Sequence, residues 1–303
     1  MATPRQMKTT EPHDALARMP AAVCLPDIQP LTNAHAAEAL CFLATRAVDS
    51  IYMTGLIRDN GVESPLNRGT FYAARDREGA LEGVALIGHA TLVEARTESA
   101  LKAFASLAKQ HPHAHVIVGQ QDKIESFWNY YGCGGQRPRQ ICRELLFEQR
   151  LPIKTLEPVA ELRPATLEEM DLIVPVNALM AEEESNVNPL AVDADGFRAR
   201  LRRRIEQGRV WVWMQDGRLI FKADVMAEAT GVTYLEGVYV RPSARGRGYG
   251  ARCLSQLGRH FLNHERVLCL LVNERNKEAQ VFFFKVGYKL RGCYDTIFLR
   301  PEH

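Results

Sequence analysis

The chain has 303 residues, of which 46% are hydrophobic, so its length and composition are those of about two domains with cores of their own. A formal charge of +2 gives no electrostatic reason to expect a nucleic acid or a membrane surface as a partner. The apolar runs are too short to span a bilayer, and the seven cysteines form no C-x-x-C pair. With no secretion-signal pattern at the N-terminus, these features predict free thiols in a reducing cytoplasm.

The first half of the chain alternates between strand and helix patterns. Residues 1–30 hold five prolines and little periodicity, which predicts a poorly ordered arm. A helical pattern begins near residue 32, and further elements are expected as strands at 70–76 and 82–95, a helix at 97–110, a strand at 115–119, a helix at 123–131 and a strand at 140–148. A segment with two prolines follows, so we expect a domain at residues 31–150 and a linker at residues 151–159.

Residues 160–303 repeat this order of elements. Helices are expected at 167–183 and 194–207, strands at 209–215, 218–229 and 232–240, and then helix, strand, helix and strand. The helix-ending glycines Gly132 and Gly287, and the buried strands near residues 115 and 268, recur at nearly the same offset. This repetition predicts an old duplication and two domains in tandem.

The most specific pattern lies at residues 234–250. A β-favouring segment, Tyr234 to Val240, leads into a turn rich in glycine and arginine, and a helical pattern starts at once. Such glycines leave room for backbone N–H groups to meet a phosphate, and the helix N-terminus adds positive charge. The turn is neither a P-loop, because Ala251 and Arg252 follow its last glycine, nor a G-x-G-x-x-G fingerprint. Taken alone, the pattern also fits a mobile loop.

The segment Arg245-Gly-Arg-Gly248-Tyr-Gly250 resembles the Q/R-x-x-G-x-G/A motif of the GNAT superfamily of N-acetyltransferases. After the next strand, Asn276, Ala279, Phe283, Gly287 and Tyr288 match the register of the family's N-x-x-A helix and its Gly-aromatic pair. The resemblance covers roughly residues 158–303. It implies an α/β (α+β) fold of two tandem GNAT-like domains, each a mixed, mostly antiparallel sheet flanked by helices. It further implies that the first of these is degenerate and that residues 160–303 bind acetyl-CoA.

The resemblance also implies the residues of the acetyl-CoA site. The pantetheine arm would lie along Val238 to Val240 and be reached by Asn276, and Phe283 stands where many members have a tyrosine that protonates the leaving thiolate. Phenylalanine has no proton donor, which puts a tyrosine-dependent mechanism in doubt; we expect Phe283→Tyr to be harmless. The expected cofactor-binding residues are Val238, Tyr239, Val240, Arg245, Gly246, Arg247, Gly248, Tyr249, Gly250, Asn276 and Phe283.

Glu236 is the candidate general base, acting directly or through water, because it is the only carboxylate in the middle of its strand. Strand alternation predicts that it shares a face with Val238 and Val240. A solvated glutamate that only orders water is the alternative. Glu182 to Glu184 precede a connection that borders the acceptor site in the family; they could attract a cationic amine or form a solvated helix end. We expect no metal site, because the alternating histidines near residue 113 lack an evident fourth ligand.

The sequence therefore predicts a cytoplasmic N-acetyltransferase that transfers acetyl from acetyl-CoA to a small-molecule or peptide amine. A non-catalytic acetyl-CoA sensor or scaffold is the alternative, and a tandem aminoacyl transferase acting on charged tRNA is disfavoured by the neutral charge. The first domain should not bind CoA, because the segment from Glu94 to Ala100 holds no glycine and adds negative charge. The acceptor and the oligomeric state stay open.

Overall fold

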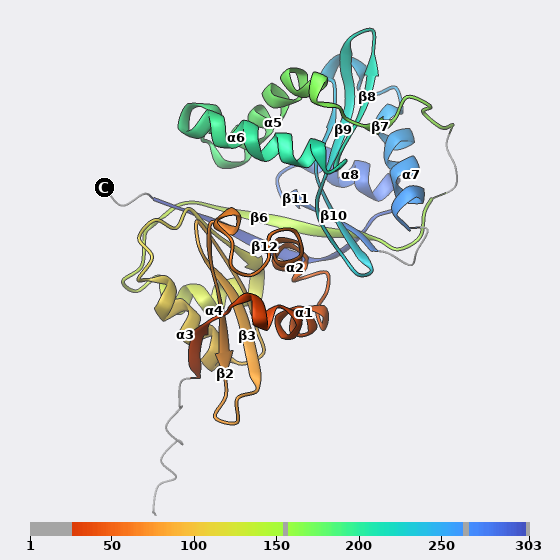
Figure 1. Cartoon of the computed structure of the whole chain (residues 1–303). Coiled ribbons are helices and arrows are strands. Elements are labelled where there is room, and N and C mark those ends of the chain that lie inside the picture. The colour runs from red at the N-terminus through yellow and green to blue at the C-terminus, as the bar shows by residue number, and fades with distance from the viewer. Residues whose placement is uncertain (1–25, 154–156, 263–266, 301–303) are drawn as a thin grey trace, which may run out of the picture.

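The computed structural model describes residues 26–153, 157–262 and 267–300 (Figure 1). Most of the expected N-terminal arm and the middle of the expected linker lie outside these residues. The arm prediction is wrong for its last residues, because Asp27–Pro30 form a strand, β1, that pairs with the strand at Gly69–Arg75. Ile28 packs there against the core of the first half, which explains why this proline-containing segment is ordered.

Each half contains helices and strands in the same order. The first half holds β1 (Asp27–Pro30), α1 (Ala36–Ala44), α2 (Ile51–Asn60), β2 (Gly69–Arg75), β3 (Leu81–Gly88), β4 (Ala90–Ala95), α3 (Glu98–Ala108), β5 (Val116–Gln120), α4 (Gln121–Tyr131) and β6 (Pro138–Gln149). The second half holds β7 (Arg163–Pro164), α5 (Met170–Ser185), α6 (Pro189–Glu206), β8 (Val210–Gln215), β9 (Arg218–Ala229), β10 (Val232–Val240), α7 (Tyr249–Leu262), β11 (Val267–Asn273), α8 (Lys277–Lys285) and β12 (Lys289–Leu299).

The strands of both halves form one continuous sheet. Its order is β1-β2-β3-β4-β5-β12-β6-β11-β10-β9-β8-β7. The pairs β4–β5 and β10–β11 are parallel, and the other pairs are antiparallel. The two halves exchange their last strands: β12 lies between β5 and β6, and β6 lies between β12 and β11 (Figure 1). The expected mixed, mostly antiparallel sheets are therefore present, but they are joined edge to edge, and a division at residues 151–159 stays a prediction.

Helices cover both faces of the sheet in each half. In the first half α1 and α2 pack on one face and α3 and α4 on the other. In the second half α5 and α6 cover one face, while α7 and α8 cover the face that holds its main core (Figure 1). The start of α2 also packs against β9, β10 and β11, so the halves share a small core of their own. Among the described residues, none of the helices has the length and apolar character to cross a bilayer.

Candidate functional site

Strands β10 and β11 separate partway along their length. Residues 232–234 pair with residues 267–269, and no further pair between these strands follows among the described residues. Beyond this point β10 keeps only its antiparallel neighbour β9, while β11 keeps β6. Residues 235–240 therefore have one edge without a neighbouring strand, and that edge leaves backbone polar groups for a ligand. We call this feature the strand opening.

A β-bulge interrupts β10 inside the strand opening. Glu236 lies opposite Asp224 and Tyr239 lies opposite Lys222, so Gly237–Val238 occupy the space of one residue of β9. Gly237 has a φ of +58°, in the left-handed region that glycine adopts without strain. The bulge therefore depends on a glycine at this position.

The bulge changes which side chains share a face. Since it shifts the alternation by one residue, Glu236 lies on the same face as Tyr239. Val240 lies opposite Phe221 and, like Val238, packs into the core beneath α7. The prediction that Glu236 shares a face with Val238 and Val240 is therefore wrong, and Glu236 instead faces α5 and α6.

A buried ion pair lies beside the bulge. Lys222 is fully buried, its Nζ lies 3.0 Å from Asp224 Oδ1, and it donates a hydrogen bond to the Gly237 carbonyl at 2.9 Å. Burial lowers the pKa of Lys222, and Asp224 opposes this effect. Asn177 of α5 donates to Asp224 at 3.3 Å, and Arg204 of α6 lies 3.7 Å from the same carboxylate. This pair ties the bulge to β9, α5 and α6. Our sequence reasoning missed it, although two charges in the middle of β9, within the otherwise apolar residues 219–227, were a signal.

Glu236 is half-buried next to the point where β10 and β11 separate. The Tyr234 hydroxyl donates a hydrogen bond to Glu236 Oε1 at 3.0 Å. Burial raises the pKa of Glu236; the Tyr234 hydrogen bond and Arg204 oppose the rise, whereas Glu144 and Asp224 add to it. A carboxylate with a raised pKa accepts protons more readily near neutral pH, which is the property of a general base.

The turn between β10 and α7 has the features of an anion site. Gly246 and Gly248 have φ values of +75° and +78°, and a Cβ at either position would meet no atom within 4 Å. The backbone N–H groups of residues 246–251 donate no hydrogen bond to any described residue. Arg245 and Arg247 are exposed, and Arg245 Nε donates to the Val240 carbonyl at 3.1 Å. Free N–H groups, a helix N-terminus and two cations fit the pyrophosphate of CoA.

Helix α8 packs against this turn. A Cβ at Gly250 would lie 3.0 Å from Val240 and 3.1 Å from the Phe282 ring, so α7 and α8 approach closely here. The Asn276 side chain accepts a hydrogen bond from the Ala279 N–H at 3.0 Å, which is the helix cap that the sequence indicates. Phe282, which our sequence reasoning did not single out, therefore packs close to the first turn of α7.

Phe283 lies in the core. It is 6% exposed, and its ring centroid lies 6.2 Å from that of Phe147 and 5.5 Å from that of Tyr288. Its place in the acetyl-CoA site stays a prediction. A harmless Phe283→Tyr would require open space around the ring, and the ring is instead packed in the core. Tyr249, at the start of α7, packs edge-on against Trp213, with ring centroids 4.8 Å apart.

The face of β10 that carries Glu236 meets side chains from both halves. Tyr52 of α2 packs edge-on against Tyr234, with ring centroids 6.3 Å apart. Glu184, at the end of α5, is an exposed residue, yet lost hydration of its carboxyl, together with Glu144 and Glu236, raises its pKa to about 8. Glu144 comes from β6 of the first half, and burial raises its pKa too. We call Glu144, Glu184 and Glu236 the carboxylate cluster.

The first half holds the end of α5 in place. Arg139 at the start of β6 donates a hydrogen bond to the Ser185 carbonyl at 2.6 Å. Gln140 donates to the Glu184 carbonyl at 3.1 Å and accepts a hydrogen bond from Asn186 at 2.7 Å. Of the three acidic residues expected at this helix end, Glu184 is thus the one that the structure places in the carboxylate cluster.

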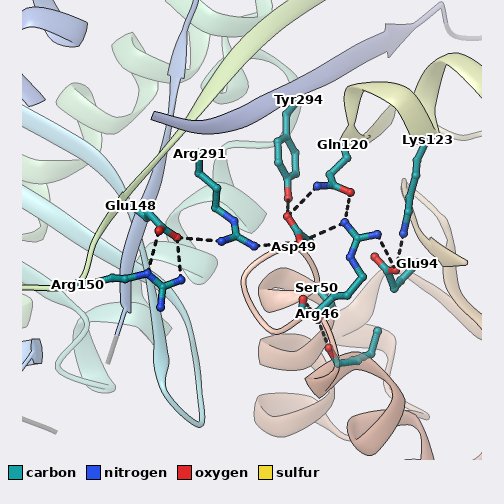
Figure 2. Close-up of polar contacts among 11 residues, drawn as sticks. Arg46, Asp49, Ser50, Glu94, Gln120, Lys123, Glu148, Arg150, Arg291 and Tyr294 are labelled. Atoms are coloured by element: carbon teal, nitrogen blue, oxygen red, sulfur yellow. Dashed lines mark hydrogen bonds and ion pairs between the residues drawn. The ribbon is translucent and has the colours of Figure 1, made fainter. Parts of the chain in front are cut away.

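The first half has a similar opening, but side chains fill it. Strands β4 and β5 pair over residues 90–92 and 116–118 and then separate. Glu94 lies two residues beyond the last pair, as Glu236 does in β10. Glu94 is 4% exposed and forms ion pairs with Lys123 and with Arg46, the latter at 3.4 Å (Figure 2). Lys123 and Arg46 therefore occupy the space beside this carboxylate.

The same network continues into the second half (Figure 2). Asp49 lies 3.2 Å from Arg46 and accepts hydrogen bonds from Gln120 at 3.1 Å and from the Tyr294 hydroxyl at 2.9 Å. Arg291 of β12 lies 3.6 Å from Asp49 and 3.1 Å from Glu148 of β6. The network therefore joins the segment between α1 and α2, the end of β5 and α4 to the exchanged strands.

The first half also lacks the long glycine turn. Only residues 96–97 separate β4 from α3, whereas residues 241–248 separate β10 from α7. The Thr97 side chain accepts a hydrogen bond from the Ala100 N–H, so it uses a donor at the start of α3. That this half binds no CoA stays a prediction.

Comparisons with known proteins agree with this architecture. Residues 218–297, from β9 to β12, match a family model described as FR47-like protein, and no curated protein matches the sequence. Three similar solved structures are a Drosophila protein (13% identity, TM-score 0.64, 92% of this chain and 100% of that one), a tandem GNAT protein from the clavulanic acid biosynthesis pathway (14%, 0.56, 91% and 99%) and a GNAT-family acetyltransferase from Colwellia psychrerythraea (13%, 0.54, 90% and 100%). At these identities the matches show the fold, which is the GNAT fold in a tandem arrangement.

Proposed function

We propose that the chain is an acetyl-CoA-dependent N-acetyltransferase in which an amine attacks directly in a ternary complex. The observation that carries this proposal is the strand opening together with the turn that follows it. The opening holds a half-buried carboxylate, Glu236, and the turn presents the free N–H groups of residues 246–251. The GNAT fold supports an acyltransferase in general. The acceptor would be a small-molecule or peptide amine, and the expected location is the cytoplasm.

In this proposal the second half holds the cosubstrate. The N–H groups of residues 246–251, with Arg245 and Arg247, would bind the pyrophosphate, and the free edge of residues 235–240 would bind the pantetheine arm next to Asn276. Acetyl-CoA would supply the activated acetyl group. The division into a degenerate domain at residues 31–150 and a CoA-binding domain at residues 160–303 belongs to the same proposal.

The protein's own groups would carry the proton and the developing charge. Glu236 accepts a proton from the ammonium, directly or through water, while the carboxyl oxygens of Glu144 and Glu184 offer hydrogen-bond acceptors to the amine. A backbone N–H at the Gly237 bulge is suited to stabilise the oxyanion, and Lys222 fixes the bulge through its carbonyl. A thiolate with a pKa near 8.5 leaves without full protonation, so the missing hydroxyl at Phe283 does not prevent turnover.

The test combines binding and turnover. Calorimetry should show one acetyl-CoA per chain, and a panel of primary amines should release free thiol, with the product identified by mass spectrometry. Glu236→Gln should lower kcat/KM by about a hundredfold and remove the acid limb of the pH profile, while CoA affinity is kept. Glu183→Gln, an exposed carboxylate on the same helix as Glu184, is the control. Wild-type rates in Glu236→Gln across the pH range would remove this residue from the mechanism.

A non-catalytic acetyl-CoA sensor or scaffold is the second candidate. The observation that favours it is Phe283, which is buried and carries no group that could protonate a leaving thiolate. Tight binding of one acetyl-CoA per chain, with no thiol release for any amine in the panel, would select this function.

A further inference from the structure

A group of basic and aromatic side chains, which the proposed mechanism does not use, lies near the carboxylate cluster. His89 and His115 of the first half stack in parallel, with ring centroids 5.0 Å apart and planes 5° from parallel. His115 packs edge-on against Phe298 of β12, and the Arg139 guanidinium lies 5.4 Å from the centre of the same ring. The residue before β5, residues of β6 and β12, and the segment between β3 and β4 thus converge at one place.

The hydrogen bond between Arg68 and His89 fixes the state of the imidazole. Arg68 Nη2 lies 3.1 Å from His89 Nδ1. Because a guanidinium only donates, Nδ1 is the acceptor, and the proton of the neutral ring is on Nε2. Burial lowers the pKa of His89 to about 4, and Arg68 adds to this effect. His89 is therefore neutral near pH 7 and presents an N–H donor.

Positive charge exceeds negative charge at this place. Burial lowers the pKa of Arg68, and the nearby Arg200 of α6 lowers it further. Asp193 offsets part of this charge through its ion pair with Arg200 at 3.2 Å. Arg139 Nη2 is buried and has no hydrogen-bond partner among the described residues. A buried donor without an acceptor costs free energy, which a bound anion would recover. We call Arg68, His89, His115, Arg139 and Arg200 the basic cluster.

Tyr52 interacts electrostatically with members of both clusters. Although this residue is 38% exposed, lost hydration raises the pKa of Tyr52 to about 12; Glu236 and Glu184 also raise it, while Arg204 and Arg68 lower it. The phenol is thus within electrostatic range of both clusters, and its ring packs against Tyr234, the hydrogen-bond partner of Glu236. Arg139 of the basic cluster also donates a hydrogen bond to the carbonyl of Ser185, the neighbour of Glu184, at 2.6 Å, so contacts between the two halves bring the clusters together.

We propose that the acceptor amine also carries an anionic group, a carboxylate or a phosphate, which binds at the basic cluster while the amine lies at Glu236. This inference rests on the proposed function and names its substrate class. Arginine recognises both kinds of oxyanion through paired N–H donors, and the His89 N–H adds a neutral donor. The first half would then select the acceptor, although it lacks a cofactor site of its own.

The test compares amines that differ only in the anionic group. Each L-amino acid is assayed beside its C-terminal amide, and O-phosphoethanolamine beside ethanolamine, in wild type, Arg68→Gln and Arg200→Gln. Arg202→Gln is the control, because Arg202 lies on the same helix as Arg200 but pairs with Glu206 at 3.6 Å. The wild type should prefer the anionic member of at least one pair by about tenfold in kcat/KM. Both cluster variants should lose most of this preference through KM, and the control should keep it.

The outcomes separate this inference from the proposed function. A wild type that prefers the uncharged members, or a preference that survives in both cluster variants, would overturn the inference and leave the acetyltransferase intact. If no amine is acetylated, the acetyltransferase is refuted, and the melting temperature of the CoA-saturated protein decides on the anion site. The anion site would be supported if the melting temperature rises more with an amino acid than with its amide, and if this difference is reduced in Arg68→Gln but not in Arg202→Gln. Equal rises would overturn it.

Discussion

Gly248 offers the sharpest test of the glycine turn. Its φ of +78° lies in the left-handed region, where an L-residue costs about 1–2 kcal/mol. An added Cβ would meet no atom within 4 Å, so Gly248→Val adds backbone strain but no clash with the protein. A loss of this size leaves a typical domain folded, since total stability is about 5–15 kcal/mol. We therefore expect the variant to fold.

The effect on CoA should be much larger than the effect on folding. The valine side chain would occupy the open space beside the free N–H groups of residues 246–251, where the pyrophosphate is expected. Losing two hydrogen bonds to a charged group, at about 1.5–3 kcal/mol each, costs about 3–6 kcal/mol of binding free energy. This corresponds to a loss of affinity of about a hundredfold to ten-thousandfold.

Gly217→Val provides a matched control. Gly217 lies in the β8–β9 hairpin with a φ of +69°, and a Cβ there would also meet no atom within 4 Å. Urea unfolding should show similar losses of stability in both variants, whereas calorimetry should show lost acetyl-CoA binding in Gly248→Val alone. Unchanged affinity in Gly248→Val, or an equal loss in both variants, would refute the assignment of the turn.

Three further predictions concern packing and charge. Phe283→Tyr should lower the free energy of unfolding by about 1–3 kcal/mol, because its hydroxyl would be buried without a partner, whereas Phe284→Tyr at a 53% exposed position should be neutral in the same urea titration. A fragment of residues 156–303 lacks β6, the neighbour of β11 and β12, so it should be insoluble, or unfolded by circular dichroism. A longer fragment that begins at Pro138 should recover structure. A 156–303 fragment that is soluble and unfolds cooperatively would contradict this prediction. The pKa of Glu184 is raised to about 8 in the folded protein. Between about pH 5 and about pH 8 the folded protein therefore holds a proton on Glu184 that the unfolded chain has lost. The contribution of Glu184 to the free energy of unfolding thus falls as pH rises from about 5 to about 8. Glu184→Gln should therefore gain stability relative to wild type over that range in urea unfolding, and Glu183→Gln should not.

The features that the sequence predicted correctly depend on neighbours along the chain. The Asn276 cap and the glycines at 246 and 248 are set by backbone geometry within a few residues, so their pattern is visible in the sequence. The strands at 218–229 and 232–240 were likewise placed with the bounds that the structure gives. Local backbone geometry thus made the turn visible in the sequence, and the family resemblance of this turn and of the later helix implied the fold class.

The features that were missed depend on partners far away in sequence. The alternation of β6 shows that one of its faces is buried, but it carries no information on which strands lie beside it. The bulge at Gly237 moved Glu236 to the other face, and the sequence shows a glycine there but not the two-to-one pairing with β9. Phe282 and Phe283 are adjacent aromatic residues, so a rotation of α8 by one residue decides which ring packs beside Gly250 of α7 and which lies in the core.

The exchange of β6 and β12 also sets the order in which this protein matures. During synthesis β1 to β6 leave the ribosome first, but the place between β5 and β6 stays empty until β12, the last described strand, has emerged. Neither half can complete its sheet alone, and pairing across such a long sequence separation is slow. Until then β5 and β6 present unpaired edges, which are sites of aggregation. A nascent chain that stalls before residue 289 therefore keeps unpaired strand edges in its first half and is prone to aggregation there, although every residue of that half has already been made.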